Sequence, residues 1–456
     1  MQPVPSLKIS ISGVRGIVGE SLTPILLTRF AGAFGSYCGG GPILVGRDTR
    51  RSGEMAQQAV VAGLLAAGCD VLDAGIVPTP TVQYNVALQP ACRGGIILTA
   101  SHNPEPWNAL KLVGADGRFL SPLQAEELLD VYHQEDARLA EAPARRVDPL
   151  PEAAERHLQA VLDRVDVAAI RRRGFRVAVD MVNGAGSVLT PRLMEALGCE
   201  MHALYGDSHA GFPRDPEPLP ERLGELEALV KSSGADIGFA QDPDADRLAL
   251  VDETGVCLGG ELTLALACRH VLEQAGGGVV VVNLSTSRAC DDVCRLAGGT
   301  LFRSKIGEIN VVLEMQRLGA CIGGEGNGGV IDPRVHLARD SFVGMALLLE
   351  HLALRGQNVT EALEGVGRYV MARRKRPRPA LRDLSRLTAE LVRHYSGRDG
   401  TVVDTRDGVW IGRADGWVHL RASNTEPIVR LQAEAGDEAR AEALVDEIEA
   451  IADELR

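Results

Sequence analysis

Three aspartates spaced two residues apart form the most distinctive chemical pattern in the chain. Asp242, Asp244 and Asp246 lie in QDPDADR, between the apolar runs IGFA and LALV. Carboxylates this close repel one another unless a cation neutralises them. Three carboxylate oxygens suit a hard divalent ion and leave octahedral positions open for water or a phosphate oxygen. We therefore expect one Mg²⁺ to bind at this loop.

Two other interpretations of the aspartate loop are a calcium loop and a solvated acidic turn. Glu253 stands at the twelfth position counted from Asp242, as in an EF-hand, but Arg247 holds the sixth position, where that turn needs glycine. LALVD also has the pattern of a strand, where a calcium loop would still be turning. A solvated turn does not account for three aspartates between apolar runs, so the sequence favours the magnesium site.

A serine ends another apolar run. IILTASHNP, residues 96–104, places Ser101 after an expected strand, where it would be a nucleophile, a helix cap or a turn residue. A serine hydrolase needs a Gly-x-Ser-x-Gly turn and a matched base, and neither accompanies Ser101. His102 is its neighbour, and adjacent side chains rarely face each other productively. Because the chain carries a metal loop instead, Ser101 is better interpreted as a carrier of a phosphoryl group.

A glycine-rich loop, IGGEGNGGVI at residues 322–331, surrounds Glu325 and Asn327. Its glycines let the backbone approach a ligand, and the two side chains can accept and donate hydrogen bonds to hydroxyl groups. The string has neither Walker nor dinucleotide-binding spacing, so taken alone it is better explained as a plain flexible turn.

A fourth loop, HLRASNTEPIVR at residues 419–430, gathers cationic and polar side chains between two strand-like runs. A guanidinium with hydroxyl and amide donors on a short turn makes a phosphate cradle. A helix cap or an ordinary Ser-Asn turn explains the same residues equally well. The candidate phosphate ligands are Arg421, Ser423, Asn424, Thr425 and, a little beyond, Arg430.

A loose unit that occurs three times predicts the scaffold for the first three loops. The copies begin at Ile43, Arg176 and Val279, and each has an apolar β-branched run, a polar or glycine turn, a helix, and a second strand-like run after glycine. Runs that are apolar on both faces suit a parallel sheet covered by helices. We therefore expect three similar mixed α/β domains with largely parallel sheets.

After Val370 the pattern changes to short strands joined by Asp407-Gly408 and Asp415-Gly416, which indicates antiparallel hairpins and a C-terminal α+β domain. We interpret the basic run at 373–378 as a solvated interdomain linker rather than a polyanion-binding patch. The expected domains are 1–150 with the Ser101 loop, 151–254 with the aspartate loop, 255–368 with the glycine-rich loop, and 369–456 with the Arg421 loop.

The composition narrows the classes of protein. Hydrophobic residues make up 45% of the chain and charged residues 24%, as in ordinary globular proteins. A net charge of -13 argues against nonspecific binding to nucleic acid or anionic membranes. The nine cysteines are scattered without zinc spacing, the amino terminus does not resemble a signal peptide, and no apolar run is long enough to span a membrane. We expect a cytoplasmic protein with reduced thiols.

With the four loops in this order, the chain resembles the α-D-phosphohexomutase family over essentially its whole length. TASHNP resembles the family's phosphoserine loop, DPDADR its magnesium loop, GEGNGG its sugar-binding loop and RASNTEP its phosphate-binding loop. The resemblance implies four domains around a central cleft and an isomerase that acts on small sugar phosphates. A phosphate on Ser101 would complete the coordination by the three aspartates, pass to a hexose phosphate to give a 1,6-bisphosphate, and return from its other end. A hexose 1,6-bisphosphate would also be the activator.

Weaker matches to the family implicate three more residues. ISGVRG, residues 11–16, resembles its amino-terminal Gly-x-Arg-Gly loop and places Arg15 near the phosphoserine. Lys111 stands where the family has a lysine proposed for acid-base work, and Arg247 follows the aspartates as the family's arginine does. The other interpretation of Arg15 is an ordinary surface arginine, and that of Lys111 is a solvated lysine.

Departures from the family's pattern bear on the substrate. The mannose and glucose branch usually has serine and histidine where this chain has Asn327 and Gly329, and a histidine where it has Glu308. GEGNGG and KIGEINV look more like the archaeal phosphoglucosamine mutases, and Glu308 would suit the ammonium group of an amino sugar. The alternatives are a phosphomannomutase or phosphoglucomutase, a metal-dependent phosphatase, and an inactive sugar-phosphate sensor. The sequence does not indicate an oligomeric state.

Overall fold

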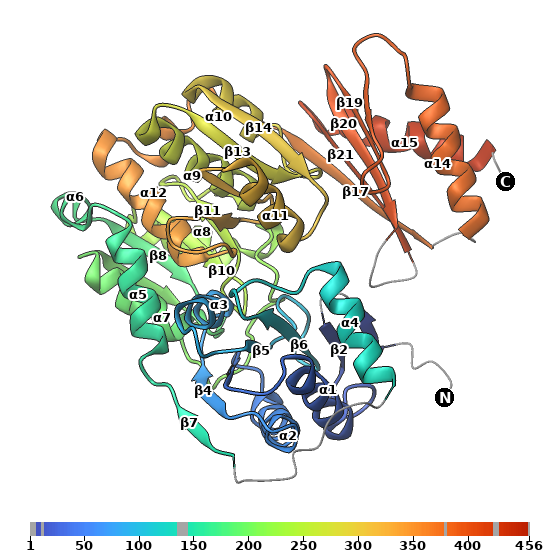
Figure 1. The fold of residues 1–456 in the computed structure, drawn as a ribbon. Coiled ribbons are helices and arrows are strands. Elements are labelled where there is room, and N and C mark those ends of the chain that lie inside the picture. The colour runs from blue at the N-terminus through green and yellow to red at the C-terminus, as the bar shows by residue number, and fades with distance from the viewer. Residues whose placement is uncertain (1–5, 11–12, 135–144, 378–380, 423–427, 455–456) are drawn as a thin grey trace.

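The computed structural model of the chain describes residues 6–10, 13–134, 145–377, 381–422 and 428–454. Three sheets with parallel central strands follow one another along the chain, and an antiparallel sheet comes last (Figure 1). The predicted fold class, three mixed α/β units and a C-terminal α+β unit, is confirmed. Within the described part of the chain, no helix is both long and apolar enough to cross a bilayer.

The first sheet has the strand order β1-β2-β6-β5-β3-β4-β7. Its strands are β1 (Lys8–Ser10), β2 (Gly13–Ile17), β3 (Ile43–Arg47), β4 (Val71–Ile76), β5 (Gly94–Leu98), β6 (Trp107–Gly114) and β7 (Val147–Pro149), and its helices are α1 (Pro24–Tyr37), α2 (Gly53–Ala66), α3 (Thr79–Leu88) and α4 (Pro122–His133). β3 and β5 are parallel, with Arg47 opposite Leu98. The segments that follow these two strands therefore meet at one edge of the sheet, and one of them contains Ser101.

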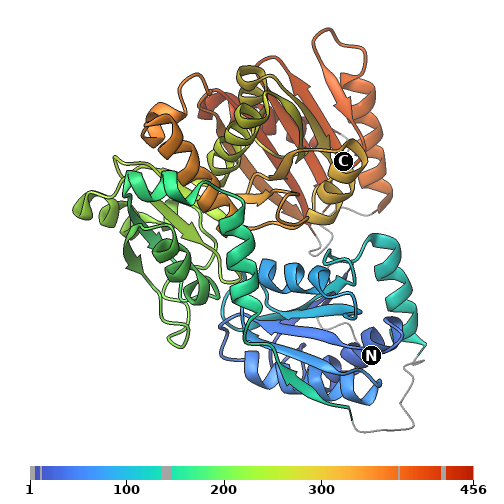
Figure 2. The same cartoon turned by 60° about the vertical axis from the view of Figure 1, so that its left-hand side comes forward.

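The second sheet has the order β12-β11-β10-β8-β9. Its strands are β8 (Arg176–Asp180), β9 (Glu200–Leu204), β10 (Ile237–Gln241), β11 (Leu248–Val251) and β12 (Cys257–Leu258), and its helices are α5 (Ala153–Asp163), α6 (Val167–Arg173), α7 (Gly186–Ala196), the short 3₁₀ helix η1 (Pro220–Arg222) and α8 (Gly224–Ser233). β10 is buried along its length because it is central, parallel to β8 and antiparallel to β11. The aspartate loop is the turn between β10 and β11. Figure 2 shows α5 between the first two units, where it packs on α3 and α7.

The third sheet has the order β14-β13-β15-β16. Its strands are β13 (Gly278–Asn283), β14 (Gly299–Ser304), β15 (Ile322–Glu325) and β16 (Gly329–Ile331), and its helices are α9 (Gly259–Ala275), α10 (Ala289–Ala297), α11 (Glu308–Leu318), α12 (Ser341–Arg355) and α13 (Val359–Ala362). α9 packs against β11 of the second sheet and β15 of the third, so the two middle sheets share one hydrophobic core. This shared core holds the aspartate loop and the glycine-rich loop in fixed relation.

The fourth sheet is antiparallel, with the order β17-β21-β20-β19-β18. Its strands are β17 (Val370–Pro377), β18 (Val402–Asp404), β19 (Val409–Arg413), β20 (Gly416–Ala422) and β21 (Ile428–Ala435), and its helices are α14 (Leu381–Tyr395) and α15 (Glu438–Glu454). A separate core lies between this sheet and α15. The Arg421 loop joins β20 to β21.

The interpretation of the basic run at 373–378 as an interdomain linker is wrong for its described part, because those residues lie in β17, although most of them are exposed to solvent as expected. This strand pairs with β21 over its whole length, with Arg374 opposite Leu431. Arg374 contacts Asp446 and Glu449 of α15 at 2.6 and 2.8 Å, and Arg376 contacts Glu449 at 2.7 Å. The positive charge that suggested a solvated segment is paired with an acidic helix that follows about 70 residues later in the chain.

Candidate active site

The loop after β5 presents Ser101 to the aspartate loop. Ser101 is buried, and its Oγ donates a hydrogen bond of 2.8 Å to Oδ2 of Asp242. The backbone φ of Ser101 is 49°, in the left-handed region that non-glycine residues enter at a cost of about 1 kcal/mol or more. Its backbone N–H donates to the hydroxyl of Thr99 at 2.9 Å. The loop therefore holds a strained serine with its hydroxyl directed at a carboxylate from another domain.

The three aspartates form the expected cluster, and the arrangement can bind a metal ion. All three are buried, and one oxygen from each lies within 4.8 Å of the others. Burial and the charges of Asp244 and Asp246 raise the pKa of Asp242 well above its ordinary value. Burial acts in the same direction on Asp244, but Lys111 outweighs it and leaves the pKa of Asp244 below its ordinary value.

Two buried cations contact the aspartates directly. Nζ of Lys111 lies 2.5 Å from Asp244 and 3.3 Å from Asp246. Burial lowers the pKa of Lys111, but these two carboxylates outweigh burial and raise it above the usual lysine value. Arg339 approaches from the loop before α12, with Nη2 2.6 Å from Oδ2 of Asp246. Lys111 therefore forms ion pairs with two of the three aspartates.

Arg15 and Arg247 lie at the border of the cluster. Nη1 of Arg15 donates to Oδ1 of Asn103 at 2.6 Å, which fastens β2 to the Ser101 loop. Burial and the neighbouring Arg247 lower the pKa of Arg15 to about 10. Nε of Arg247 lies 3.8 Å from both Asp242 and Asp246. The structure therefore brings both predicted arginines to the Ser101 and aspartate loops.

Arg339 also connects the aspartates to the expected sugar-binding residues. Its Nε donates to Glu308 at 2.9 Å and its Nη1 to Glu325 at 2.7 Å. Glu308, the first residue of α11, also accepts a bond of 2.9 Å from Gln83 of α3, and burial raises its pKa. Three carboxylates from different segments contact this guanidinium. Asp246 also pairs with Lys111, whereas Glu308 and Glu325 share the one cation.

The glycines beside Glu325 serve the fold directly. A Cβ on Gly328, where φ is 85°, would stand 1.9 Å from the carbonyl oxygen of Leu248. This loop therefore packs backbone against backbone on β11, close to the end of the aspartate loop. Oδ1 of Asn327 accepts from the N–H of Gly329 at 3.1 Å and shapes the same turn. We expected the glycines to let the backbone approach a ligand, but at Gly328 the backbone approaches the neighbouring strand.

The Arg421 loop lies partly outside the described residues, because Ser423, Asn424 and Thr425 fall in the segment between β20 and β21 that the structure does not describe. Arg421 and Arg430 stand opposite each other on these two strands. Burial lowers the pKa of Arg421, while the charge of Glu325 acts in the opposite direction, so the two residues are electrostatic neighbours. His419 Nδ1 lies 2.9 Å from the Ser285 hydroxyl, which fixes β20 against the third unit.

Sequence reasoning missed several residues that complete the site. No motif or spacing in the sequence points to Arg339. The neighbouring Asp340 caps a helix, because its Oδ1 accepts from the N–H groups of Phe342 and Val343. Thr79 of α3 donates to Asp244 at 2.6 Å from a segment that carries no motif. Gln83, one turn further along α3, contacts Glu308. These residues meet only through the packing of three units.

A second group of possible metal ligands is His157, His336 and Asp340. Both histidine Nε2 atoms lie near Oδ2 of Asp340, at 2.7 and 2.9 Å, and Nδ1 of His157 lies 2.9 Å from the hydroxyl of Thr81. Burial raises the pKa of Asp340, but His157 outweighs burial and lowers the pKa below its ordinary value. We interpret the group as a hydrogen-bond network that supports the Arg339 loop, since these bonds already satisfy both oxygens of Asp340.

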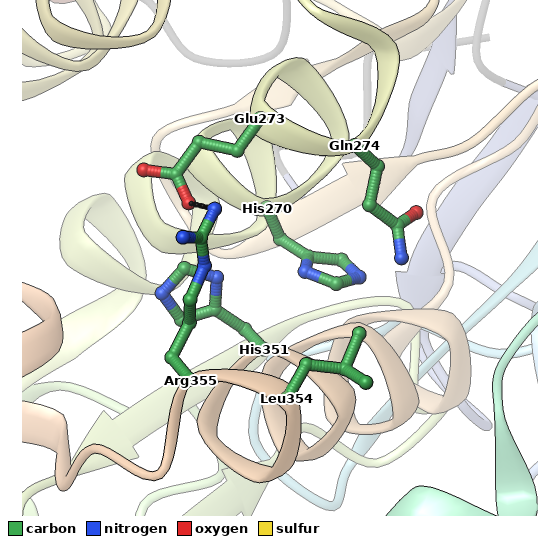
Figure 3. A pocket seen from close by; sticks show the side chains of 6 residues that line it. All are labelled: His270, Glu273, Gln274, His351, Leu354 and Arg355. Carbon is green, nitrogen blue, oxygen red and sulfur yellow. Dashed lines mark hydrogen bonds and ion pairs between the residues drawn. The ribbon is translucent and has the colours of Figure 1, made fainter.

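A cavity of about 240 Å³ lies between α9 and α12 (Figure 3). Its lining residues are His270, Glu273, Gln274, His351, Leu354 and Arg355. None of these was predicted as a site residue, and their charged groups are paired locally, with Arg355 2.8 Å from Glu273 and His270 2.6 Å from Glu350. Both ring nitrogens of buried His351 have no hydrogen-bond partner among the described residues. Burial, followed by the charge of His270, lowers the pKa of His351 to about 4.

We expect His351 to weaken the fold in acid. The folded chain keeps its ring neutral down to about pH 4, whereas the unfolded chain protonates it near pH 6.5, so the unfolded state binds more protons between these values. The contribution of the neutral His351 ring to the free energy of unfolding is fully present above pH 6.5. It falls by about 1–3 kcal/mol as the pH drops towards 4. Thermal midpoints of the wild type and His351→Gln, measured from pH 7 to 4.5, should converge in acid. The exposed His133 gives the control variant, His133→Gln, whose curve should run parallel to the wild type; a parallel curve for His351→Gln would contradict the prediction.

The chain matches family models for all four domains of one protein family. Residues 7–139, 155–255 and 259–369 match the phosphoglucomutase/phosphomannomutase alpha/beta/alpha domains I, II and III, and residues 370–451 match the C-terminal domain. These matches cover most of the chain and fall on the four sheets in order.

Individual relatives match along almost the whole chain. A protein of Methanopyrus kandleri named probable phosphoglucosamine mutase is 38% identical over 96% of this chain and 95% of its own. A phosphoglucomutase/phosphomannomutase of Thermococcus kodakarensis is also 38% identical, over 94% of each chain. A crystal structure of a phosphoglucomutase/phosphomannomutase family protein from Burkholderia thailandensis superposes with a TM-score of 0.84 at 28% identity, covering 98% of both chains.

Proposed function

The chain belongs to the α-D-phosphohexomutase family, and on that premise we propose that it interconverts glucosamine 6-phosphate and glucosamine 1-phosphate. The class is a phosphohexomutase, an isomerase that moves phosphate between two positions of a sugar. The observation that supports the catalytic scheme most directly is the 2.8 Å contact between the Ser101 hydroxyl and Asp242 inside a buried cluster of three aspartates. Ser101 would carry the phosphate.

The aspartate cluster fits a divalent cation, and we propose one Mg²⁺ per chain. Oδ1 of Asp244 and Oδ1 of Asp246 are buried without hydrogen-bond partners among the described residues. Buried carboxylate oxygens of this kind are costly unless they are ligated, and an all-oxygen donor set is the preference of Mg²⁺. When bound by Asp242, Asp244 and Asp246, the ion would offset the negative charge of a phosphate on Ser101.

In the proposed cycle the bond between Ser101 Oγ and phosphorus breaks while the free hydroxyl of the hexose phosphate bonds to the same phosphorus. That hydroxyl gives up its proton, and Ser101 Oγ gains one. The resulting 1,6-bisphosphate turns over in the site and returns its other phosphate to Ser101. Lys111 supplies a fixed positive charge beside Asp244, and Arg15 and Arg247 add charge at the border, so the equatorial oxygens of the transferring group meet cations. A hexose 1,6-bisphosphate would activate the chain by phosphorylating Ser101.

The distal phosphate would bind the loop between β20 and β21. Arg421 and Arg430 face each other on neighbouring strands, which suits a doubly charged anion. Nε of Arg421 is buried without a hydrogen-bond partner among the described residues and lies 3.8 Å from Asp407. Binding energy from this phosphate would orient the reacting end of the sugar. Ser423, Asn424 and Thr425 are proposed to complete the cradle.

The charges around Arg339 favour an amino sugar. Glu308 and Glu325 both pair with this one guanidinium, so on the sugar side of the cluster two carboxylates share one paired cation and negative charge exceeds positive charge. An ammonium group at the sugar's second carbon would offset that excess, whereas a hydroxyl would not. Glu325 and Asn327 are proposed to bind hydroxyls in both orientations of the sugar. The second candidate is a phosphomannomutase or phosphoglucomutase, which is favoured by the direct pairing of Glu308 with Arg339 and by the name of the Thermococcus relative.

A panel of substrates tests the proposal. In coupled assays, kcat/KM for glucosamine 1-phosphate should exceed those for mannose 1-phosphate and glucose 1-phosphate by about 10-fold or more, the effect of one charge-assisted hydrogen bond. Equal or higher values for mannose or glucose would assign the second candidate instead. Phosphate release is measured in parallel: a mutase releases little and is stimulated by glucose 1,6-bisphosphate, whereas a phosphatase releases it steadily.

A further inference from the structure

Arg50 is a buried arginine that the proposed chemistry does not use. It belongs to GRDTRRSG, the segment that follows β3, and only 1% of its surface is exposed. Its guanidinium reaches into the Ser101 loop and donates to four backbone carbonyl oxygens, three in the loop and one at the first residue of β6. The acceptors are Ser101 at 2.5 Å and Asn103 at 2.7 Å, both from Nη2, and Pro104 at 2.8 Å and Trp107 at 2.9 Å, both from Nη1.

The remaining N–H of the guanidinium closes a ring of hydrogen bonds. Nε of Arg50 donates to Oδ2 of Asp48 at 3.0 Å, and the same carboxylate oxygen accepts from the hydroxyl of Thr99 at 2.7 Å. The Thr99 hydroxyl in turn accepts from the N–H of Ser101. All five donors of the guanidinium are therefore used, and both peptide groups of Ser101 are held.

The second unit covers this ring. The face of the Arg50 guanidinium lies 5.0 Å from the ring centroid of Phe212, a residue of the loop between β9 and α8. Arg50 thus connects the segment after β3, the Ser101 loop and the unit that carries the aspartates. The pairing of β3 with β5 brings these segments together, since Arg47 lies opposite Leu98 at the ends of the two strands.

We propose that Arg50 is a positioning residue for phosphoryl transfer, holding the strained Ser101 backbone so that Oγ stays directed at the aspartates with and without its phosphate. The inference rests on the proposed function, because it assigns a role within the same site. A serine whose N–H and carbonyl are both fixed has only its side chain free to move. No other residue type supplies five N–H donors in one plane; lysine has three donors at a single point.

The test compares turnover with stability. Arg50→Lys keeps the charge but loses the planar set of donors, and its kcat should fall about 100-fold, as a misplacement near 1 Å does, with KM within about threefold of the wild type. Thr99→Val removes one hydroxyl from the ring and should lower kcat about 10-fold, while Thr99→Ser, which keeps the hydroxyl, should restore it. The assays are run below the unfolding temperature of each variant, and the amount of phosphate bound to each protein is measured beforehand.

Two further measurements separate positioning from general stability. Protein phosphorylated with glucose 1,6-bisphosphate should give one ³¹P resonance, and in Arg50→Lys and Thr99→Val that resonance should broaden or move towards free phosphoserine. Arg164, a partly buried arginine whose Nε lies 2.5 Å from Asp332, is the control. Arg164→Lys should lower the thermal midpoint and leave kcat and the resonance unchanged.

The outcomes are distinct. Folded Arg50→Lys with wild-type kcat and an unmoved resonance overturns the inference. If Arg50→Lys does not fold, the comparison of Thr99→Val with Thr99→Ser tests the inference instead. Equal kcat values for these two variants would overturn the inference. If the wild type takes up no phosphate from glucose 1,6-bisphosphate, the proposed function fails, and the inference with it, before any variant is compared.

Discussion

Replacing Ser101 with alanine is expected to lower mutase turnover by about 10⁴-fold or more, because the group that would carry the phosphate is removed. The Ser101 side chain is buried against Asp242, so the loss of one hydroxyl leaves the surrounding packing in place. Intact-mass measurement after incubation with glucose 1,6-bisphosphate should show one added phosphate on the wild type and none on Ser101→Ala.

The matched control for this variant is Ser101→Gly. The φ of 49° strains alanine as it strains serine, whereas glycine adopts it at little cost. Both variants lack the hydroxyl, so both should be inactive, while Ser101→Gly should be the more stable of the two. Wild-type turnover in either variant would rule out the phosphoserine scheme.

The second large effect is expected from Asp244→Asn, which should weaken Mg²⁺ binding and lower kcat, each by about 100-fold or more. The change removes one negative charge from the cluster and leaves Lys111, now 2.5 Å from a neutral amide, as a less compensated buried cation. Calorimetric titration of the resting protein with MgCl₂ measures the binding directly, without reference to turnover.

A buried aspartate nearby provides the control. Asp252 directly follows β11, and its carboxylate accepts hydrogen bonds from Thr254 and Val256 without contacting the cluster. Asp252→Asn should change the stability of that turn and leave Mg²⁺ affinity within about twofold of the wild type. If the Asp244→Asn variant bound Mg²⁺ as tightly as the wild type does, the aspartate loop would not be the metal site, whatever the turnover of the variant.

Much of the architecture could be predicted because it is a local property of the chain. The apolar β-branched runs at Ile43, Arg176 and Val279 specify buried strands by themselves, and the turns that follow them need glycine or polar residues whatever lies nearby. The run at 373–378 failed as a local prediction because its neighbours are distant. Arg374 is partly exposed and Arg376 exposed, as expected, but the sequence did not reveal that they lie in a strand and pair with Glu449 of α15.

The residues of the candidate site likewise fall into those that the sequence indicates and those that only the packing of the sheets brings together. The sequence by itself determined the donors, because residues as close as Asp242, Asp244 and Asp246 must share one turn, and because Ser101 follows an apolar strand-like run directly. The tertiary structure decided the partners. Lys111 against Asp244, Arg339 among three carboxylates, and Arg50 around Ser101 are contacts between residues 14 to 133 positions apart. No spacing in one chain encodes such pairs, since each depends on how whole sheets pack, and a buried charge reveals its role only when the charge opposite it is in place.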